Sequence, residues 1–119
     1  MKILIVDDSA FMRTILRDLV KKSFPDATLS EAADGNEAIT KYRSERPDLL
    51  LLDLIMPEKD GMEVLKEIGR ESGKKIVVVS SVGQEAMIEE ARKLGADAYV
   101  VKPFDEKELT STISDVIKA

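Results

Sequence analysis

Three aspartates, a serine and a lysine stand directly after short apolar segments, where their side chains could act together. Asp7 and Asp8 end the first apolar segment, and Asp53 follows four consecutive leucines. Ser80 and Lys102 end two further apolar segments. Carboxylate oxygens bind hard divalent cations, whereas an ammonium and a hydroxyl can hold phosphoryl oxygens. These residue types are therefore the ones that phosphoryl transfer requires.

Taken singly, each of these residues has a simpler interpretation. An aspartate after a strand usually caps the next helix or forms an Asx turn, and a lone serine or lysine there is ordinary surface chemistry. The combination is harder to explain in this way, because Asp7 and Asp8 cannot both cap the same helix. Asp53 also lies in an apolar stretch, where a carboxylate raises the free energy of the fold unless another group compensates it.

Three carboxylates in one place indicate a cation site. They repel one another unless one binds a proton or a cation neutralises them. The chain has no histidine and no cysteine, so the available ligand atoms are oxygens, which suit Mg²⁺ or Mn²⁺. Beside such a cation and Lys102, the carboxylate of Asp53 could act as a nucleophile toward phosphorus.

The elements that would position these residues alternate along the chain. Compact apolar segments typical of strands occupy residues 2–6, 27–32, 49–52, 75–79 and 98–101. Apolar residues recur at helical spacing in the segments between and after them, and Asp34 and Asp105 provide capping signals for two of those helices. This alternation predicts an α/β fold, with a parallel sheet covered by helices on both faces. Ligands bind at the carboxyl ends of the strands in such sheets, which is where the candidate residues stand.

Composition excludes several classes of protein. With 119 residues and no linker or low-complexity tract, we expect one domain over residues 1–119. The formal net charge of -5 disfavours binding to nucleic acid. No apolar segment approaches the roughly 20 residues that a membrane span needs, and the N-terminus does not resemble a secretory signal. We therefore expect a cytoplasmic protein without membrane insertion.

Three segments carry a resemblance to a known family. They are ILIVDDSAFMR at residues 3–13, LLLLDLIMPEKDGMEVL at 49–65 and GADAYVVKPF at 95–104. Together they resemble response-regulator receiver domains, and more narrowly the stand-alone, CheY-type chemotaxis regulators. The resemblance covers the whole chain. It implies the flavodoxin-like receiver fold, a doubly wound five-stranded parallel sheet of order 2-1-3-4-5 with five helices.

The resemblance also implies roles for single residues. Asp53 corresponds to the phosphoacceptor of the family. Asp7, Asp8, Asp53 and the backbone carbonyl of Ile55 correspond to the ligands of Mg²⁺. Ile55 and Val82 are aliphatic at positions that flank the phosphoryl group in relatives, so we expect them to hinder the hydrolytic water.

Further roles implied by the resemblance concern the later strands. Ser80 and Lys102 would contact the phosphoryl group, and the bond between Lys102 and Pro103 would be cis. Ser80 and Tyr99 would form a switch, in which the aromatic ring turns inward as the hydroxyl moves toward the phosphoryl group. From the residues alone, Tyr99 is equally well explained as a half-buried aromatic residue of a strand.

The implied function is signalling rather than catalysis. The family accepts a phosphoryl group and loses it only slowly. Since this chain has no histidine, the phosphoryl group would come from another protein or from a small phosphodonor, and the resemblance implies a sensor histidine kinase. The output would be a protein that binds the face formed by the fourth helix, the fifth strand and the fifth helix, residues 84–119. In chemotaxis this partner would be a flagellar motor component or an adaptor.

Other functions remain open at this stage. The chain could be a phosphorelay intermediate of a different two-component pathway, or an interaction module that no longer uses phosphate. A Mg²⁺-dependent phosphohydrolase is disfavoured, because those enzymes usually carry Asp-x-Asp after the first strand, whereas here Ser9 follows Asp8. A nucleotide-binding protein is disfavoured because neither Gly-x-Gly-x-x-Gly nor a P-loop pattern is present.

Overall fold

The computed structural model describes residues 1–71 and 73–119, in which strands and helices alternate as predicted. No helix in these ranges has the length and apolar character needed to cross a bilayer. The strands are β1 (Lys2–Val6), β2 (Thr28–Ala32), β3 (Leu49–Leu52), β4 (Lys75–Ser80) and β5 (Ala98–Val101). The helices are α1 (Ala10–Ser23), α2 (Gly35–Glu45), α3 (Gly61–Ile68), α4 (Glu85–Lys93) and α5 (Glu106–Lys118).

The described strands form a parallel sheet of order β2-β1-β3-β4-β5, which confirms the predicted fold. The three inner strands are almost completely buried, as expected for strands covered on both faces. Two boundaries differ slightly from the prediction. Strand β2 begins at Thr28, because the amide of Ala27 bonds to the carbonyl of Phe24 in a turn, and β4 includes Ser80.

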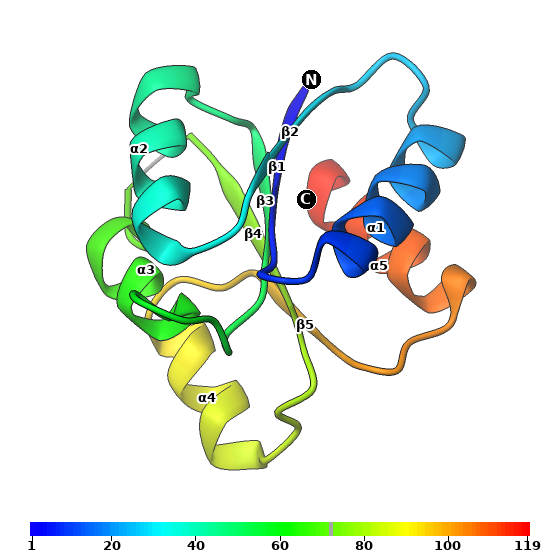
Figure 1. Cartoon of the computed structure of the whole chain (residues 1–119). Coiled ribbons are helices and arrows are strands. Elements are labelled where there is room, and N and C mark those ends of the chain that lie inside the picture. Colours follow the sequence, from blue (N-terminus) through cyan, green and yellow to red (C-terminus); the bar gives the residue numbers. More distant parts are fainter. Residues whose placement is uncertain (72) are drawn as a thin grey trace.

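Helices cover both faces of the sheet, with α2, α3 and α4 on one face and α1 and α5 on the other (Figure 1). Successive side chains of each strand point to opposite faces. In β3, Leu50 and Leu52 therefore pack toward α2 and α3, while Leu49 and Leu51 pack toward α1 and α5. This central strand is held from both sides, so it gives the residue that follows it, Asp53, a fixed position.

Most helices begin at a side chain that accepts a hydrogen bond from the first turn. Asp34 and Asp105 do so as predicted, and Ser9 and Asp60 cap α1 and α3. Helix α4 differs, because its N-cap residue Gln84 makes no side-chain capping bond. Such a bond typically contributes about 1 kcal/mol, so the start of α4 is less firmly anchored than the other helix starts.

The C-terminal ends of α3 and α4 meet backbone to backbone at two glycines. Gly95 has a φ of 115°, and a Cβ atom built there would lie 2.0 Å from the carbonyl oxygen of Gly69. A Cβ atom on Gly69 would in turn lie 1.8 Å from the carbonyl oxygen of Leu94. Neither position leaves room for a side chain. The two helices therefore pack more closely here than larger residues would permit.

Candidate functional site

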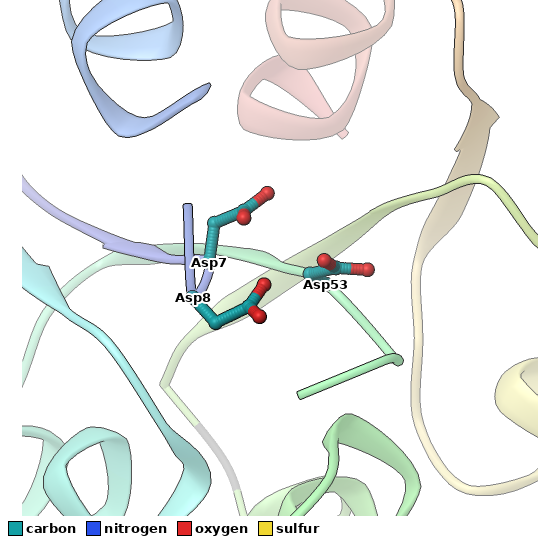
Figure 2. Close-up of side chains that lie close together, drawn as sticks. All are labelled: Asp7, Asp8 and Asp53. Atoms are coloured by element: carbon teal, nitrogen blue, oxygen red, sulfur yellow. The ribbon is translucent and has the colours of Figure 1, made fainter. Parts of the chain in front are cut away.

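The order of the sheet brings the first and third strands together at their carboxyl ends. Val6 is paired with Leu52, so Asp7 and Asp53, one residue further along each strand, are neighbours. Asp8 projects from the same edge, and Figure 2 shows the three carboxylates beside one another. One oxygen atom of each carboxylate lies within 4.8 Å of the others. The structure thus brings the predicted acidic residues into one cluster.

Two of these aspartates also form local turns. Asp7 Oδ1 accepts a hydrogen bond from the amide of Ser9 at 2.9 Å, and Asp53 Oδ1 accepts one from the amide of Ile55 at 3.2 Å. These are the Asx turns of the simpler interpretation, so that interpretation is correct in part. It is wrong about the cap of α1, because the side chain of Ser9 accepts from the amide of Met12. Each turn uses one carboxylate oxygen and directs the other toward the cluster.

Lys102 reaches this cluster from the end of β5. Its Nζ atom donates to Asp7 Oδ2 at 2.7 Å and lies 3.3 Å from Asp53 Oδ2. Burial lowers the pKa of Lys102, but the hydrogen bond to Asp7 and the charge of Asp53 outweigh that effect, and the pKa is raised overall. The amino group of Lys102 is therefore protonated, and positively charged, at neutral pH. The peptide bond between Lys102 and Pro103 is cis.

Burial dominates the ionisation of Asp53, whose side chain is almost inaccessible to solvent. Removal from water raises the pKa of Asp53, and the negative charge of Asp7 acts in the same direction. Lys102 and the amide of Ile55 lower the pKa again without cancelling the effect of burial. An ionised Asp53 is therefore destabilised in this pocket, and binding of a cation or loss of its charge would relieve the penalty.

Asp53 is expected to make the stability of the metal-free protein depend on pH. Its carboxyl has a raised pKa in the folded chain, compared with the ordinary value of 3.8. Between the two values the folded state holds more protons than the unfolded state, so the free energy of unfolding falls as the pH rises. In urea unfolding with a chelator present, we expect this fall in the wild type and its loss in Asp53→Asn. The exposed Asp18 on α1, changed to asparagine, is the control, and a fall that persists in Asp53→Asn contradicts the prediction.

The two residues of the predicted switch meet at the backbone of Val82. Ser80 is fully buried at the end of β4, and its Oγ atom accepts from the amide of Val82 at 3.3 Å. The hydroxyl of Tyr99 donates to the carbonyl of Val82, and its ring packs against the core on the α2–α4 side. Burial raises the pKa of Tyr99, while the hydroxyl of Ser80 acts in the opposite direction. The structure therefore links both candidates to the segment that precedes α4.

Two aliphatic residues, Ile55 and Val82, are expected to flank the phosphoryl group. Ile55 is 56% exposed in the loop after Asp53, and Val82 is partly buried in the loop after β4. The amide of Ile55 is directed at Asp53, while the role of its carbonyl as a ligand stays a prediction.

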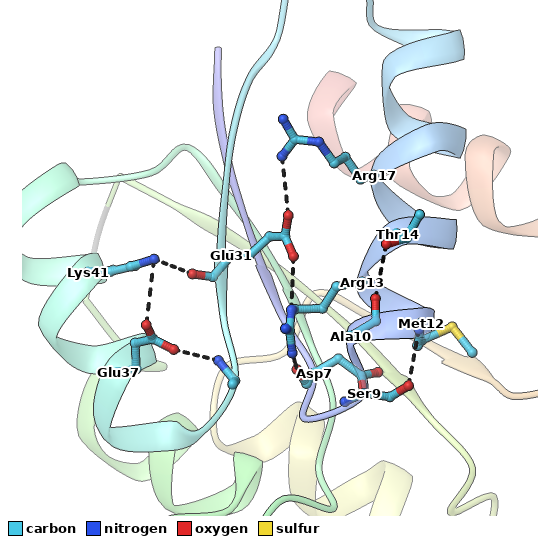
Figure 3. Close-up of polar contacts among 11 residues, drawn as sticks. Asp7, Ser9, Ala10, Met12, Arg13, Thr14, Arg17, Glu31, Glu37 and Lys41 are labelled. Carbon is cyan, nitrogen blue, oxygen red and sulfur yellow. Dashed lines mark hydrogen bonds and ion pairs between the residues drawn. The ribbon is translucent and has the colours of Figure 1, made fainter.

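Arg13 and Glu31 extend the site, although neither of them is assigned a role from the sequence alone. Arg13 Nη1 donates to the backbone carbonyl of Asp7 at 2.7 Å, and its Nε atom donates to Glu31 Oε1 at 2.9 Å (Figure 3). Two signals were available in the sequence: Arg13 ends the segment 3–13 that carries the family resemblance, and Glu31 is a charged residue within an expected strand. A charge at such a position requires a partner, but the sequence does not say which residue provides it.

The donor atoms of the cluster fit Mg²⁺ or Mn²⁺. They are carboxylate oxygens from two buried residues, Asp7 and Asp53, and one exposed residue, Asp8. Mg²⁺ usually binds through one or two carboxylates and keeps several waters, so the exposed side of this cluster suits it. The carboxylates of the cluster outnumber the single positive charge of Lys102, and a divalent cation would neutralise the remaining negative charge.

Comparisons with known proteins show which sequences and folds this chain is similar to. The family described as response regulator receiver domain matches residues 3–114. The chain is 41% identical over 119 residues to the chemotaxis protein CheY of Halobacterium salinarum, which covers 99% of this chain and 98% of that protein. It is 41% identical over 118 residues to CheY of Thermotoga maritima, with 98% of each covered. The structure of a CheX–CheY–BeF3–Mg complex from Borrelia burgdorferi gives a TM-score of 0.92 at 29% identity, covering 98% of this chain and 89% of that chain.

Proposed function

The chain belongs to the response-regulator receiver family and is closely related to the CheY chemotaxis regulators, and from this premise we propose a specific function for it. The protein is a single-domain response regulator, residues 1–119, that accepts a phosphoryl group on Asp53 in a Mg²⁺-dependent reaction. It acts in the cytoplasm and signals in chemotaxis through proteins that bind its phosphorylated form.

The observation that carries this proposal is the cluster of Asp7, Asp8 and Asp53 with Lys102 at one edge of the sheet. The Oδ2 atom of Asp53 is the oxygen that its local turn leaves for reaction. Lys102 is close enough to follow charge that develops on a phosphoryl group attached there. Bound Mg²⁺ would supply the remaining neutralisation of the carboxylates and of the incoming phosphoryl oxygens. Asp7, Asp8, Asp53 and the carbonyl of Ile55 would hold it.

This chain contains no histidine, so its phosphoryl group comes from another molecule, and the donor proposed here is a phosphohistidine of another protein. An oxygen of Asp53 attacks phosphorus, the bond between phosphorus and the imidazole nitrogen breaks, and the imidazole takes up a proton as it leaves. The new bond joins the carboxylate oxygen to phosphorus, and the product is an acyl phosphate. In the relatives this donor is a sensor histidine kinase, and we propose the same class of donor here.

The output surface is the face formed by α4, β5 and α5, residues 84–119. Two features of α4 support its choice as the element that moves. Its N-cap residue Gln84 makes no side-chain capping bond, and Ala91 is the residue that it buries. Tyr99 connects the same region to Val82, beside Ser80. A helix with so little of its surface buried can change position at low cost, which suits binding of a flagellar motor component or an adaptor.

Incubation of the purified protein with acetyl phosphate and Mg²⁺ tests the proposal against its alternatives. We expect a mass increase of one phosphoryl group per chain that persists long enough to be measured by intact-protein mass spectrometry. Rapid release of inorganic phosphate without an accumulated product would instead indicate a phosphohydrolase. Absence of any reaction would indicate an interaction module that does not use phosphate.

Ile55→Asn is expected to shorten the lifetime of the phosphorylated form. The exposed aliphatic side chain of Ile55 shields the region beside Asp53, whereas an amide can orient a water molecule toward the phosphorus. We expect dephosphorylation to accelerate about tenfold, which corresponds to about 1.4 kcal/mol in the barrier. The measurement is decay of the phosphoprotein after removal of the donor. Ile55→Val serves as the control, and equal lifetimes for the asparagine and valine variants would refute the shielding role.

A further inference from the structure

We propose that Arg13 is a positioning residue for cation binding at this site, because its guanidinium group holds the backbone of Asp7. The inference rests on the proposed function, since it concerns the same cation site. Arg13 lies in the second turn of α1 and reaches back to the turn that precedes the helix. Its Nη1 atom donates to the carbonyl of Asp7 and its Nε atom to Glu31 on β2 (Figure 3). One side chain thus connects α1, the end of β1 and the edge strand.

Asp7 is held by a separate partner at each of its polar groups. Its amide donates to the carbonyl of Ala32 at 3.1 Å, and its carbonyl accepts from Arg13 at 2.7 Å. Its two carboxylate oxygens accept from the amide of Ser9 and from Lys102. A cation that binds the carboxylate must compete with Lys102, whereas the two backbone contacts can stay. The contacts of Ala32 and Arg13 therefore determine where the carboxylate of Asp7 is presented.

Glu31 makes this arrangement compatible with a cation site. A guanidinium group next to the cluster would repel a divalent cation, and the ion pair with Glu31 at 2.9 Å offsets that charge. Glu31 is itself held from several directions, since Arg17 donates to its Oε2 atom at 3.3 Å and Lys41 donates to its backbone carbonyl. The side chain of Arg13 is 17% exposed and that of Arg17 is 44% exposed. The pair that involves Arg13 is therefore less screened by solvent and the better ordered of the two.

The geometry requires an arginine at position 13. Its planar group offers donors in a fixed fork, so it can bond to a carbonyl and a carboxylate at the same time. A lysine could reach either acceptor with its single ammonium group but would not fix the angle between them. Arg13→Lys should accordingly restore only part of what the arginine provides.

Arg13→Met and Arg17→Met form a matched pair of variants. Both remove a cation of α1 that pairs with Glu31, but only Arg13 contacts Asp7. The readouts are the dissociation constant of Mg²⁺ by titration and the amide hydrogen exchange of Asp7 and Ser9, whose amides are hydrogen-bonded, in the metal-free protein. For Arg13→Met we expect Mg²⁺ binding about tenfold weaker, as for other groups that orient metal ligands, with faster exchange at those two amides. For Arg17→Met we expect both readouts to equal those of the wild type, and urea unfolding of each variant shows whether general destabilisation contributes.

The outcomes separate this inference from the proposed function. If the wild type binds Mg²⁺ and the two methionine variants bind it equally well, the ion pairs only tie α1 to β2 and the inference is wrong. Tighter Mg²⁺ binding by Arg13→Met would also overturn it, since repulsion would then outweigh positioning. Intermediate affinity for Arg13→Lys supports it. A wild-type protein that binds no Mg²⁺ would refute the proposed function itself, and with it the role of Arg13.

Discussion

Asp53→Asn is expected to abolish transfer of a phosphoryl group to this protein while leaving its fold intact. The amide is not a nucleophile toward phosphorus at neutral pH, but its oxygen can still accept the hydrogen bond from Ile55 that shapes the turn. Lys102 keeps its bond to Asp7 in this variant. With acetyl phosphate and Mg²⁺, intact-protein mass spectrometry should therefore show an unmodified chain, and urea unfolding should show a cooperative transition.

Two controls define this result. Asp18→Asn removes an exposed carboxylate of α1, far along the helix from the cluster, and should accept the phosphoryl group as the wild type does. Addition of a chelator to the wild type should suppress the reaction. A phosphoryl group that persists in Asp53→Asn, on Asp7 or Asp8 for example, would show that a different carboxylate is the acceptor.

Gly95→Ala is expected to destabilise the protein strongly, because steric overlap and backbone strain act together at this position. The new methyl group would have to occupy space 2.0 Å from the carbonyl oxygen of Gly69, and the backbone at a φ of 115° is unfavourable for alanine. The combined cost of overpacking and backbone strain is about 3–5 kcal/mol. Urea unfolding at 25 °C measures it directly, as a lower midpoint with an unchanged slope.

Gly73→Ala isolates the contribution of the backbone. Gly73 also has a positive φ, 86°, but apart from the glycine and its chain neighbours no atom of the described residues lies within 4 Å of the position of its Cβ. We expect a loss of about 1–2 kcal/mol, from conformational strain alone. Equal losses in the two variants would mean that the close approach of the ends of α3 and α4 adds no steric cost to the alanine at position 95.

The order of elements was predictable because each carries its own local signal. The four leucines of β3 are too few for a helix and bounded by polar residues, and Asp34 and Asp105 mark helix starts that the structure confirms. The boundary of β2 was not predictable in the same way. Ala27 fits an alternating pattern, but its amide is used in a turn that depends on the position of Phe24.

The acidic cluster was predictable because parallel strands end at the same edge of a sheet. The contact between Arg13 and Glu31 was not, since it depends on how α1 lies against the edge of β2, which no periodicity encodes. The cap of α1 was not predictable either, because Asp7 and Asp8 were both candidates and the residue that caps the helix is Ser9. The carboxylate of Asp7 bonds to the amide of Ser9, which leaves the hydroxyl of Ser9 to cap the helix.

Steric crowding differs between the two neighbours of Asp53, since the start of α3 packs tightly against its backbone and the segment before α4 is exposed. A Cβ atom on Gly61 would lie 2.2 Å from the carbonyl oxygen of Asp53, so α3 begins in backbone contact with that residue and has no space to move toward it. On the other side, Ser81, Gly83 and Gln84 are exposed. If Asp53 is phosphorylated as proposed, a displacement around it would meet less steric resistance from the exposed segment before α4 than from the start of α3. A substitution that rigidifies the segment before α4 would then reduce the conformational response to phosphorylation without changing phosphoryl transfer to Asp53.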